Sequence, residues 1–266
     1  MKLIFLTGSH PRHLHIAKRL HEEGLLQALL IEKREELMPN PHPSWSELDQ
    51  HNFVRHFSDR QSAEEQAFGE ADLKVFEGIP VREVTIDQLN SSETRQWVIE
   101  QNPQAVVSYG VHKLDEETLS VFPEISWNIH GGLSPWYRGN ITLFWPFYFL
   151  KPNWAGMTIH QLTSQLDGGA VIHHSVPELH RGEGLHDVAC NAVKQAAEDL
   201  IHLFNKMGEG QSFKAIPQRS SGKLFTSKDW APQHLRLVYN TFNNDIVDRY
   251  LDGELGHEEP KLVRAF

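Results

Sequence analysis

The first 31 residues of the chain alternate between two apolar runs and one amphipathic segment. Residues 2–6 form a compact apolar run that predicts a strand, and a polar turn at residues 7–10 follows it. Ile16, Ala17 and Leu20 then recur with a helical period until Gly24, and residues 25–31 form a second apolar run. A strand, a helix and a strand in this order favour a parallel sheet with helices on its faces. The predicted fold class is therefore α/β, with a Rossmann-like, mostly parallel sheet.

The rest of the chain continues this alternation and adds an antiparallel portion. A charged segment at 33–77 contains a Pro-rich turn and a helical stretch, and we expect it to lie on the surface of the same domain. Residues 156–162 and 170–175 are apolar runs joined by a short turn, so they should pair antiparallel. Further strands are expected at 79–84, 105–108 and 125–130, and helices at 87–101, 116–121, 141–150, 184–207 and around 232–251.

The same pattern predicts how the chain divides. Residues 1–207 are expected to form the main domain, closed by the long helix at 184–207. Residues 208–266 are expected to form a short C-terminal extension with one further helix.

Composition and charge argue against several classes of function. The chain has 266 residues, a net charge of -10 and a sequence pI near 5.9, so broad binding to nucleic acid is not expected. The densest apolar run, 141–150, is about half as long as the roughly 20 residues that cross a membrane, and Pro146 interrupts it. Cys190 is the single cysteine, which excludes an intramolecular disulfide and favours a reducing cytoplasm. The sequence leaves open whether the protein forms a homodimer.

Two groups of histidines are candidates for a metal site. His10, His13 and His15 lie close together, and the pair at 173–174 is adjacent, but neither group has the spacing of a zinc site. We expect solvated surface histidines and no metal. The turn at residues 7–9 could cradle a phosphate, but it lacks the GxGxxG pattern, so a structural turn is expected.

Two polar side chains lie on the apolar strand expected at 125–130. Period-two alternation points Asn128 and His130 to one face near the carboxyl end of the strand, where ligands bind in open α/β sheets. Gly131 and Gly132 follow, and they allow the backbone to turn sharply and approach a bound molecule. From this spacing alone, a ligand-facing pair and an interior histidine beside a capping asparagine are equally compatible.

Asp167 lies in the turn of the expected hairpin, where an aspartate usually only forms the turn. If the hairpin packs beside the strand at 125–130, the carboxylate can face His130. An amide, an imidazole and a carboxylate would then converge, a set that suits attack of an amine on an acyl carbon. The imidazole would take a proton, the carboxylate would orient and charge the imidazole, and the amide would donate to the oxyanion.

Two segments resemble a known family. AVVSYGVHKLDEETLSVFPEISWNIHGGLSPWYRGN and GMTIHQLTSQLDGGAVIH are similar to folate-dependent formyltransferases, which include glycinamide ribonucleotide, methionyl-tRNA and sugar-nucleotide N-formyltransferases. The likeness covers about residues 79–205, and Asn128, His130 and Asp167 fall on the three catalytic positions of the family. The resemblance implies transfer of a formyl group from N10-formyltetrahydrofolate to a primary amine. His130 would relay the amine proton with support from Asp167, while Asn128 and His130 would stabilise the oxyanion.

The same resemblance implies where the folate co-substrate would lie. Its pterin would contact a few short segments, largely through backbone hydrogen bonds and apolar contacts. The implied positions are Ile86, Ser108, Tyr109, Gly110, Leu114 and Thr163. The chain also departs from the family: Gly131-Gly132-Leu133-Ser134-Pro135 stands where Pro-Ser-Leu-Leu-Pro is common, so Ser134 is a candidate substitute for the usual loop serine.

Length and charge narrow the acceptor that the resemblance implies. Methionyl-tRNA enzymes of this family carry a further oligonucleotide-binding domain, for which the segment after residue 207 is too short. An acidic core with a short tail is most similar to the sugar-nucleotide group, whose acceptor is an amino sugar on a nucleoside diphosphate. The alternatives are a formyltetrahydrofolate hydrolase, a glycinamide ribonucleotide-type enzyme and a non-catalytic folate or nucleotide binding module.

Overall fold

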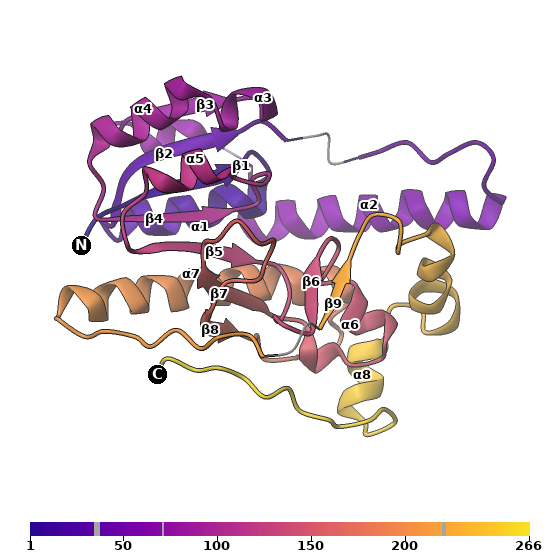
Figure 1. Ribbon diagram of the computed structural model, residues 1–266. Coiled ribbons are helices and arrows are strands. Elements are labelled where there is room, and N and C mark those ends of the chain that lie inside the picture. The colour runs from indigo at the N-terminus through magenta and orange to yellow at the C-terminus, as the bar shows by residue number, and fades with distance from the viewer. Residues whose placement is uncertain (35–37, 71, 220–221) are drawn as a thin grey trace.

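A seven-stranded sheet in the order β3-β2-β1-β4-β5-β7-β8 forms the centre of the molecule (Figure 1). The computed structural model describes residues 1–34, 38–70, 72–219 and 222–266. The parallel strands are β1 (Leu3–Gly8), β2 (Leu26–Glu32), β3 (Val81–Val84), β4 (Ala105–Tyr109) and β5 (Ser126–His130). β7 (Met157–Gln161) and β8 (Val171–Ser175) continue the sheet antiparallel. The expected α/β class and the antiparallel hairpin are confirmed.

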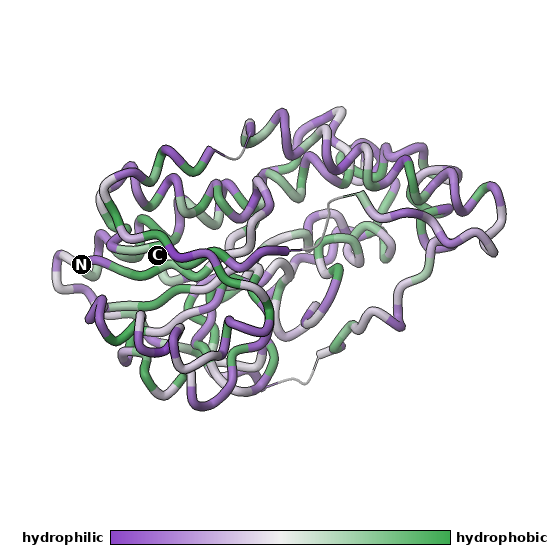
Figure 2. The backbone as a smooth tube through the Cα atoms, turned by 90° about the horizontal axis from the view of Figure 1, so that it is seen from above, coloured by the Kyte–Doolittle hydropathy of each residue, from purple (hydrophilic) through white to green (hydrophobic). Residues whose placement is uncertain are grey.

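Helices cover both faces of this sheet. On one face, α1 (Pro11–Glu22) and α7 (Leu185–Gly208) pack against alternate strand residues such as Phe5 and Ile129. The other face carries α3 (Ile86–Leu89), α4 (Ser92–Gln101) and α5 (Glu116–Ser120), which pack over residues such as Ile4 and Val106. Almost every residue of β1, β2 and β4 is accordingly buried, and apolar stretches run through the body of the molecule (Figure 2). Burial on both faces explains why these strands read as apolar runs in the sequence.

α2 (Glu47–Phe68) is a 22-residue helix that reaches well beyond the sheet (Figure 1). Ser46 caps it, because its side-chain oxygen accepts from the Asp49 N–H at 3.2 Å. The helix packs against α1 and α7, and it buries Phe53, His56 and Glu64. The segment at 33–77, which was expected on the surface, is therefore partly buried against α1 and α7. Residues 35–37 and 71 of this segment lie outside the described residues. A 3-10 turn, η1 (Leu73–Phe76), follows α2.

Three of the expected helices differ in the structure. The helix expected at 87–101 is two helices, because α3 ends at Leu89 and Ser91 caps α4 by accepting from the Thr94 N–H at 3.2 Å. The helix expected at 141–150 shrinks to α6 (Trp145–Tyr148), since Ile141 and Leu150 have positive φ angles of 58° and 55°. A short turn, η2 (Pro152–Trp154), leads from it to β7.

The helix expected around 232–251 is divided into three short pieces. These are η3 (Pro232–His234), a π-helical turn η4 (Leu237–Thr241) and α8 (Ile246–Leu251). Asn243 and Asn244 separate the last two with positive φ angles of 48° and 62°, a conformation that asparagine tolerates. Along the described part of the chain, no helix is both long enough and apolar enough to cross a membrane.

The segment after residue 207 packs closely against the rest of the chain. β9 (Lys223–Phe225) pairs in parallel with β6 (Tyr137–Gly139), a short strand that the sequence pattern did not predict. Phe225, Val238 and Ile246 join Phe144 and Trp145 in one apolar cluster. The boundary at residue 207 stays a prediction, and the segment beyond it contributes to the same packed body.

The carboxyl ends of three parallel strands meet at one edge of the sheet. Thr7 of β1 lies beside Tyr109 of β4, and Ser108 of β4 lies beside Asn128 of β5. Loops that leave these strands therefore gather at one place, as expected for ligand sites in open α/β sheets.

Candidate active site

Asn128 and His130 lie on β5 and point to the same side, as their spacing predicts. β5 pairs antiparallel with β7, which places Asn128 opposite His160 and His130 opposite Thr158. Trp127 and Ile129 point the other way, into the core. Rigid strands thus fix both polar side chains at the edge of the sheet.

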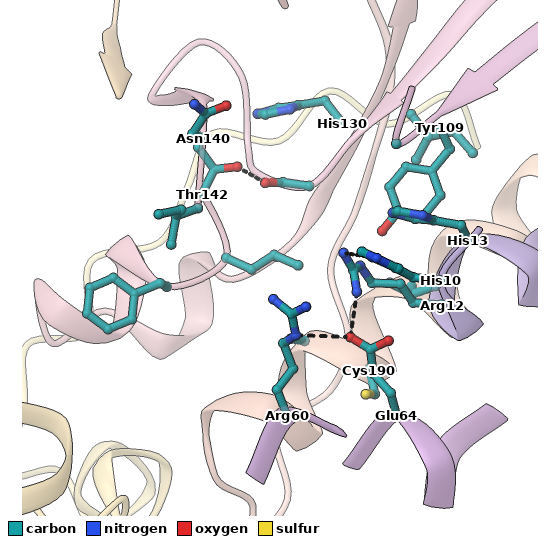
Figure 3. A pocket seen from close by; sticks show the side chains of 18 of the residues that line it. His10, Arg12, His13, Arg60, Glu64, Tyr109, His130, Asn140, Thr142 and Cys190 are labelled. Atoms are coloured by element: carbon teal, nitrogen blue, oxygen red, sulfur yellow. Dashed lines mark hydrogen bonds and ion pairs between the residues drawn. The ribbon is translucent and has the colours of Figure 1, made fainter. Parts of the chain in front are cut away.

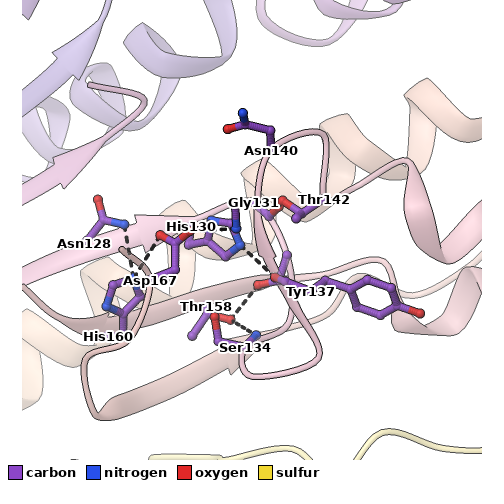
Figure 4. Close-up of polar contacts among 12 residues, drawn as sticks. Asn128, His130, Gly131, Ser134, Tyr137, Asn140, Thr142, Thr158, His160 and Asp167 are labelled. Carbon is purple, nitrogen blue, oxygen red and sulfur yellow. Dashed lines mark hydrogen bonds and ion pairs between the residues drawn. The ribbon is translucent and has the colours of Figure 1, made fainter. Parts of the chain in front are cut away.

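Asp167 reaches His130 from the turn between β7 and β8 (Figure 4). Its Oδ2 lies 3.5 Å from His130 Nδ1, and the two side chains are 8% and 7% exposed. The same oxygen accepts from the Gly139 N–H of β6 at 2.9 Å. The structure therefore brings Asn128, His130 and Asp167 into one site.

The backbone of the Asp167 turn is unusual. Asp167 has a φ of 47°, in the left-handed region that side-chain-bearing residues seldom adopt. Two residues later, a Cβ at Gly169 would lie 1.8 Å from the Gln161 carbonyl oxygen, so only glycine fits there. The turn is thus shaped to aim the carboxylate at His130, at a local conformational cost that the surroundings must offset.

The hydrogen bonds of His130 define its neutral tautomer. His130 Nε2 lies 2.8 Å from the Tyr137 carbonyl oxygen, which can only accept, so Nε2 carries the proton. In the neutral imidazole the lone pair is then on Nδ1, the atom that faces Asp167. Burial lowers the pKa of His130, and the Asp167 charge partly opposes this shift. His130 is consequently a neutral base with a carboxylate beside its basic nitrogen.

Asp167 remains ionised beside this base. Burial raises the pKa of its carboxyl, but the neighbouring imidazoles of His130 and His160 and the hydrogen bond from the Gly139 N–H outweigh burial, and the pKa falls to about 2. A proton taken up by His130 at Nδ1 would therefore be stabilised by a fixed negative charge.

His160 is a site residue that the sequence analysis did not single out. Its Nδ1 donates to the Gln161 carbonyl oxygen at 2.8 Å, which leaves Nε2 as an acceptor. That atom lies 3.2 Å from Asn128 Nδ2 and 3.7 Å from Asp167 Oδ1. The pairing of β7 with β5 could have identified it, because His160 and Asn128 face each other across the two strands.

Two neighbours fix the orientation of the Asn128 amide. Its Oδ1 accepts from the Ser108 hydroxyl at 2.7 Å, and its Nδ2 donates one proton to His160. A flipped amide would place its oxygen beside His160 Nε2, which also accepts, so the orientation of the amide is fixed and its second N–H can donate to a bound molecule. A fixed N–H of this kind can stabilise a developing oxyanion.

The loop after His130 explains the departure at position 132. A Cβ at Gly132 would lie 2.6 Å from the Tyr137 carbonyl oxygen and 2.9 Å from His130 Nε2. A side chain there would therefore disturb the hydrogen bond that sets the tautomer of His130. Ser134 does not replace the usual loop serine, because it is fully buried, with its N–H bonded to Thr158 and its carbonyl to His174. Thr142 lines the cavity instead, with its hydroxyl donating to the Gly131 carbonyl.

A cavity of about 400 Å³ opens from the site toward α1, α2 and α7 (Figure 3). Arg12 and Glu64 form an ion pair of 2.7 Å across it, and Arg60 Nε lies 3.6 Å from the same Glu64 oxygen. Arg12 also lies 2.9 Å from His10 Nδ1. Charged groups of both signs therefore line the space beside His130 and Asp167.

Four of the five histidines expected on the surface are buried, and His15 is half-buried. His10, His13, His173 and His174 are all less than a tenth exposed. The ring of His13 fits because Gly8 and Gly110 have no Cβ; one at Gly8 would lie 2.3 Å from its Nδ1, and one at Gly110 would lie 2.4 Å from its Nε2. Within the described ranges, no group of three or more metal-ligating side chains could hold an ion.

The positions implied for folate divide between two neighbouring spaces. Ser108, Leu114 and Thr163 line a smaller pocket of about 90 Å³, which Asn128 and Asp167 also border. Tyr109 and Gly110 line the larger cavity instead. Ile86 is half exposed on α3 and borders neither of these two pockets.

Comparison with solved structures places this architecture among known folds. The chain has a TM-score of 0.55 to a sugar N-formyltransferase from a Shewanella species, at 13% identity over 90% of this chain and 87% of the other. The score is also 0.55 for a phosphoribosylglycinamide formyltransferase from Anaplasma phagocytophilum, at 14% identity over 85% and 98% of the two chains. The chain has the formyltransferase fold.

A third solved structure with the formyltransferase fold is similar to the same extent. A 4-N formyltransferase from Francisella tularensis gives a TM-score of 0.53 at 16% identity over 86% of this chain and 78% of the other. No family model matches the sequence. The formyltransferase fold is thus evident from the structure, whereas the activity has to be argued from the site.

Proposed function

We propose that the protein transfers a formyl group from N10-formyltetrahydrofolate to a primary amine of a small molecule. One observation carries the proposal: an imidazole base, a carboxylate and an oriented amide meet beside a cavity. His130 Nδ1 and Asp167 Oδ2 are 3.5 Å apart, and the Asn128 amide is held by Ser108 and His160. The formyltransferase fold of the chain supports this reading of the site.

The proposed reaction follows from the protonation states of these residues. The acceptor nitrogen attacks the formyl carbon, a new C–N bond forms, and His130 Nδ1 takes the proton that the nitrogen loses. Asp167 stabilises the resulting imidazolium, and the Asn128 N–H donates to the oxyanion. The bond between the formyl carbon and N10 of the folate then breaks, N10 receives the proton that His130 took up, and the products are a formamide and tetrahydrofolate.

Two spaces could hold the two substrates. The pocket lined by Ser108, Leu114 and Thr163 suits the folate co-substrate, because it borders Asn128 and Asp167 from the side of β4 and β7. The larger cavity, lined by Arg12, Arg60 and Glu64, then remains for the acceptor. Its mixed charges are suited to a polar molecule with hydrogen-bonding groups.

The acceptor we favour is an amino sugar linked to a nucleoside diphosphate, in a cytoplasmic enzyme. The similarity to a sugar N-formyltransferase supports it, and the similarity to a phosphoribosylglycinamide formyltransferase supports glycinamide ribonucleotide as the second candidate. Hydrolysis of the folate without an amine is the third.

The test supplies N10-formyltetrahydrofolate together with a panel of amines and follows formation of tetrahydrofolate and the formylated amine. We expect a formamide with at least one amino-sugar nucleotide. Formate release at one rate with and without amines would favour the hydrolase. Absence of both products would contradict the proposed function.

A further inference from the structure

The segment beyond residue 207 contacts the candidate site through residues 216–218 and 223–225. Ile216 begins these contacts by pairing with Val171 of β8, since each residue donates its N–H to the carbonyl of the other at 2.8 Å. This pairing fixes the segment beside the hairpin that holds Asp167. The segment lies outside residues 79–205, over which the sequence resembles formyltransferases.

Gln218 binds the turn that holds Asp167. Its Nε2 donates to the Asp167 carbonyl oxygen at 2.8 Å and to the Gly169 carbonyl oxygen at 2.7 Å. One side-chain amide thus spans the turn from both ends. The turn needs such support because Asp167 has a φ of 47°, and residues in sparsely populated backbone conformations persist only where several contacts hold them.

The same segment also supports the other partners of the site. β9 pairs with β6, and the Phe225 carbonyl accepts from the Asn140 N–H at 2.8 Å. β6 supplies the Tyr137 carbonyl that binds His130 and the Gly139 N–H that binds Asp167. Residues 216–218 and 223–225 therefore hold the backbone on both sides of the His130–Asp167 pair.

We propose that Gln218 is a positioning residue for formyl transfer, which holds the Asp167 carboxylate at His130 by fixing the turn around Asp167. The role of Gln218 in catalysis rests on the proposed function, whereas its role in fixing the turn around Asp167 rests on the two hydrogen bonds. Without them the turn can relax from its left-handed conformation, and the carboxylate then spends less time beside the imidazole. A misplacement of about 1 Å at a reacting group is sufficient to slow catalysis about 100-fold.

Gln218→Met tests this inference directly. Methionine has a similar length and shape but no N–H donor, and position 218 is only partly buried, so the fold should persist. Gln218→Glu changes a single atom group and, when ionised, also removes both donors. Gln211→Met is the matched control, because Gln211 is exposed on the same segment.

The first readout is the pKa of His130, measured by NMR titration, which requires no turnover. The charged or titratable groups that face His130 are Asp167, His160 and Arg138. Because the Asp167 charge raises the pKa of His130, loosening the turn should lower that pKa in Gln218→Met and leave it unchanged in Gln211→Met. The second readout is kcat, which should fall about tenfold to a hundredfold in Gln218→Met and Gln218→Glu, with KM for the amine and the melting temperature nearly unchanged.

The outcomes separate this inference from the proposed function. If the wild-type protein formylates an amine and Gln218→Met keeps both its kcat and the wild-type pKa of His130, the positioning role is refuted and the function stands. If no amine is formylated but the pKa of His130 falls in Gln218→Met, the proposed function fails and the positioning of Asp167 by Gln218 stands. A parallel loss of melting temperature and kcat without a change in the pKa of His130 would indicate a merely structural residue.

Discussion

His130 Nδ1 and Asp167 Oδ2 lie 3.5 Å apart, although they come from a strand and from a turn that is 37 positions later in the chain. Since Nε2 of His130 is bonded to a carbonyl, Nδ1 is the nitrogen that can take a proton. The closest negative charge therefore lies beside the basic atom of the site. This arrangement makes several predictions.

Removing the Asp167 charge should lower activity without unfolding the protein. In Asp167→Asn the imidazolium loses its stabilising charge, and we expect kcat to fall by about 100-fold to 10,000-fold. Asp199→Asn is the matched control, because Asp199 and His173 form another buried pair, 3.2 Å apart, outside the cavity. Steady-state kinetics that show equal losses in both variants would contradict the role of Asp167.

Activity should persist below the ordinary pKa of histidine. Burial lowers the pKa of His130 from its usual 6.5, so the neutral base remains available at pH 6.5 and the acid limb of the kcat/KM profile should lie below that pH. Asp167, with a pKa of about 2, stays ionised throughout this range. An acid limb above pH 7 would show that His130 is not the base.

The same shifts predict how stability depends on pH. Folding favours the deprotonated forms of both groups, because the folded pKa of each lies below its unfolded value. Both groups contribute fully to the free energy of unfolding above pH 6.5. The contribution of His130 declines as the pH falls below 6.5, and the contribution of Asp167 declines between about pH 4 and pH 2. Denaturation by urea as a function of pH should show less of this decline in a His130→Ala, Asp167→Ala double variant.

His160 should act through Asn128. His160→Phe removes the acceptor of the Asn128 N–H, so the amide can rotate and we expect kcat to fall about tenfold, which corresponds to about 1.4 kcal/mol. His160→Gln keeps an acceptor at this position and should lose less. Equal kcat values for wild type and His160→Phe would exclude this role.

The sequence alone predicted the sheet, and it singled out three residues that the structure brings together, for a physical reason. Strands such as β1 and β4 are buried on both faces and therefore read as apolar runs, against which Asn128 and His130 are conspicuous. β6 and β9 were not predictable, because three-residue strands form only through pairing between segments more than 80 positions apart. Gln218 was missed for the same reason, since only the folded chain brings it to Asp167.

The buried histidines show where a pattern in one segment is insufficient. His13 lies on an amphipathic helix, yet its ring occupies space left by Gly8 and by Gly110, about 100 positions away. The apolar run at 141–150 has the composition of a core helix, but the left-handed residues Ile141 and Leu150 at its ends break it. For His13, contacts from a distant segment override local preference.

Gly132 should be intolerant of a side chain. In Gly132→Ala the new Cβ would meet the Tyr137 carbonyl oxygen at 2.6 Å, and φ is 155°, so we expect a loss of about 1–3 kcal/mol of stability. Gly131→Ala is the matched control for stability, because its Cβ would contact only Leu143, at 3.6 Å. Thermal unfolding compares the two, and equal melting temperatures would contradict the close approach at position 132.

The most direct test of the account is to measure formyl transfer and folate binding together in wild type and His130→Ala. The account predicts that the wild-type protein forms a formamide and tetrahydrofolate in equal amounts. His130→Ala should bind a folate analogue as tightly as the wild-type protein and yet form neither product at a measurable rate. Undiminished turnover in His130→Ala would contradict the central claim that His130, supported by Asp167, is the base in formyl transfer.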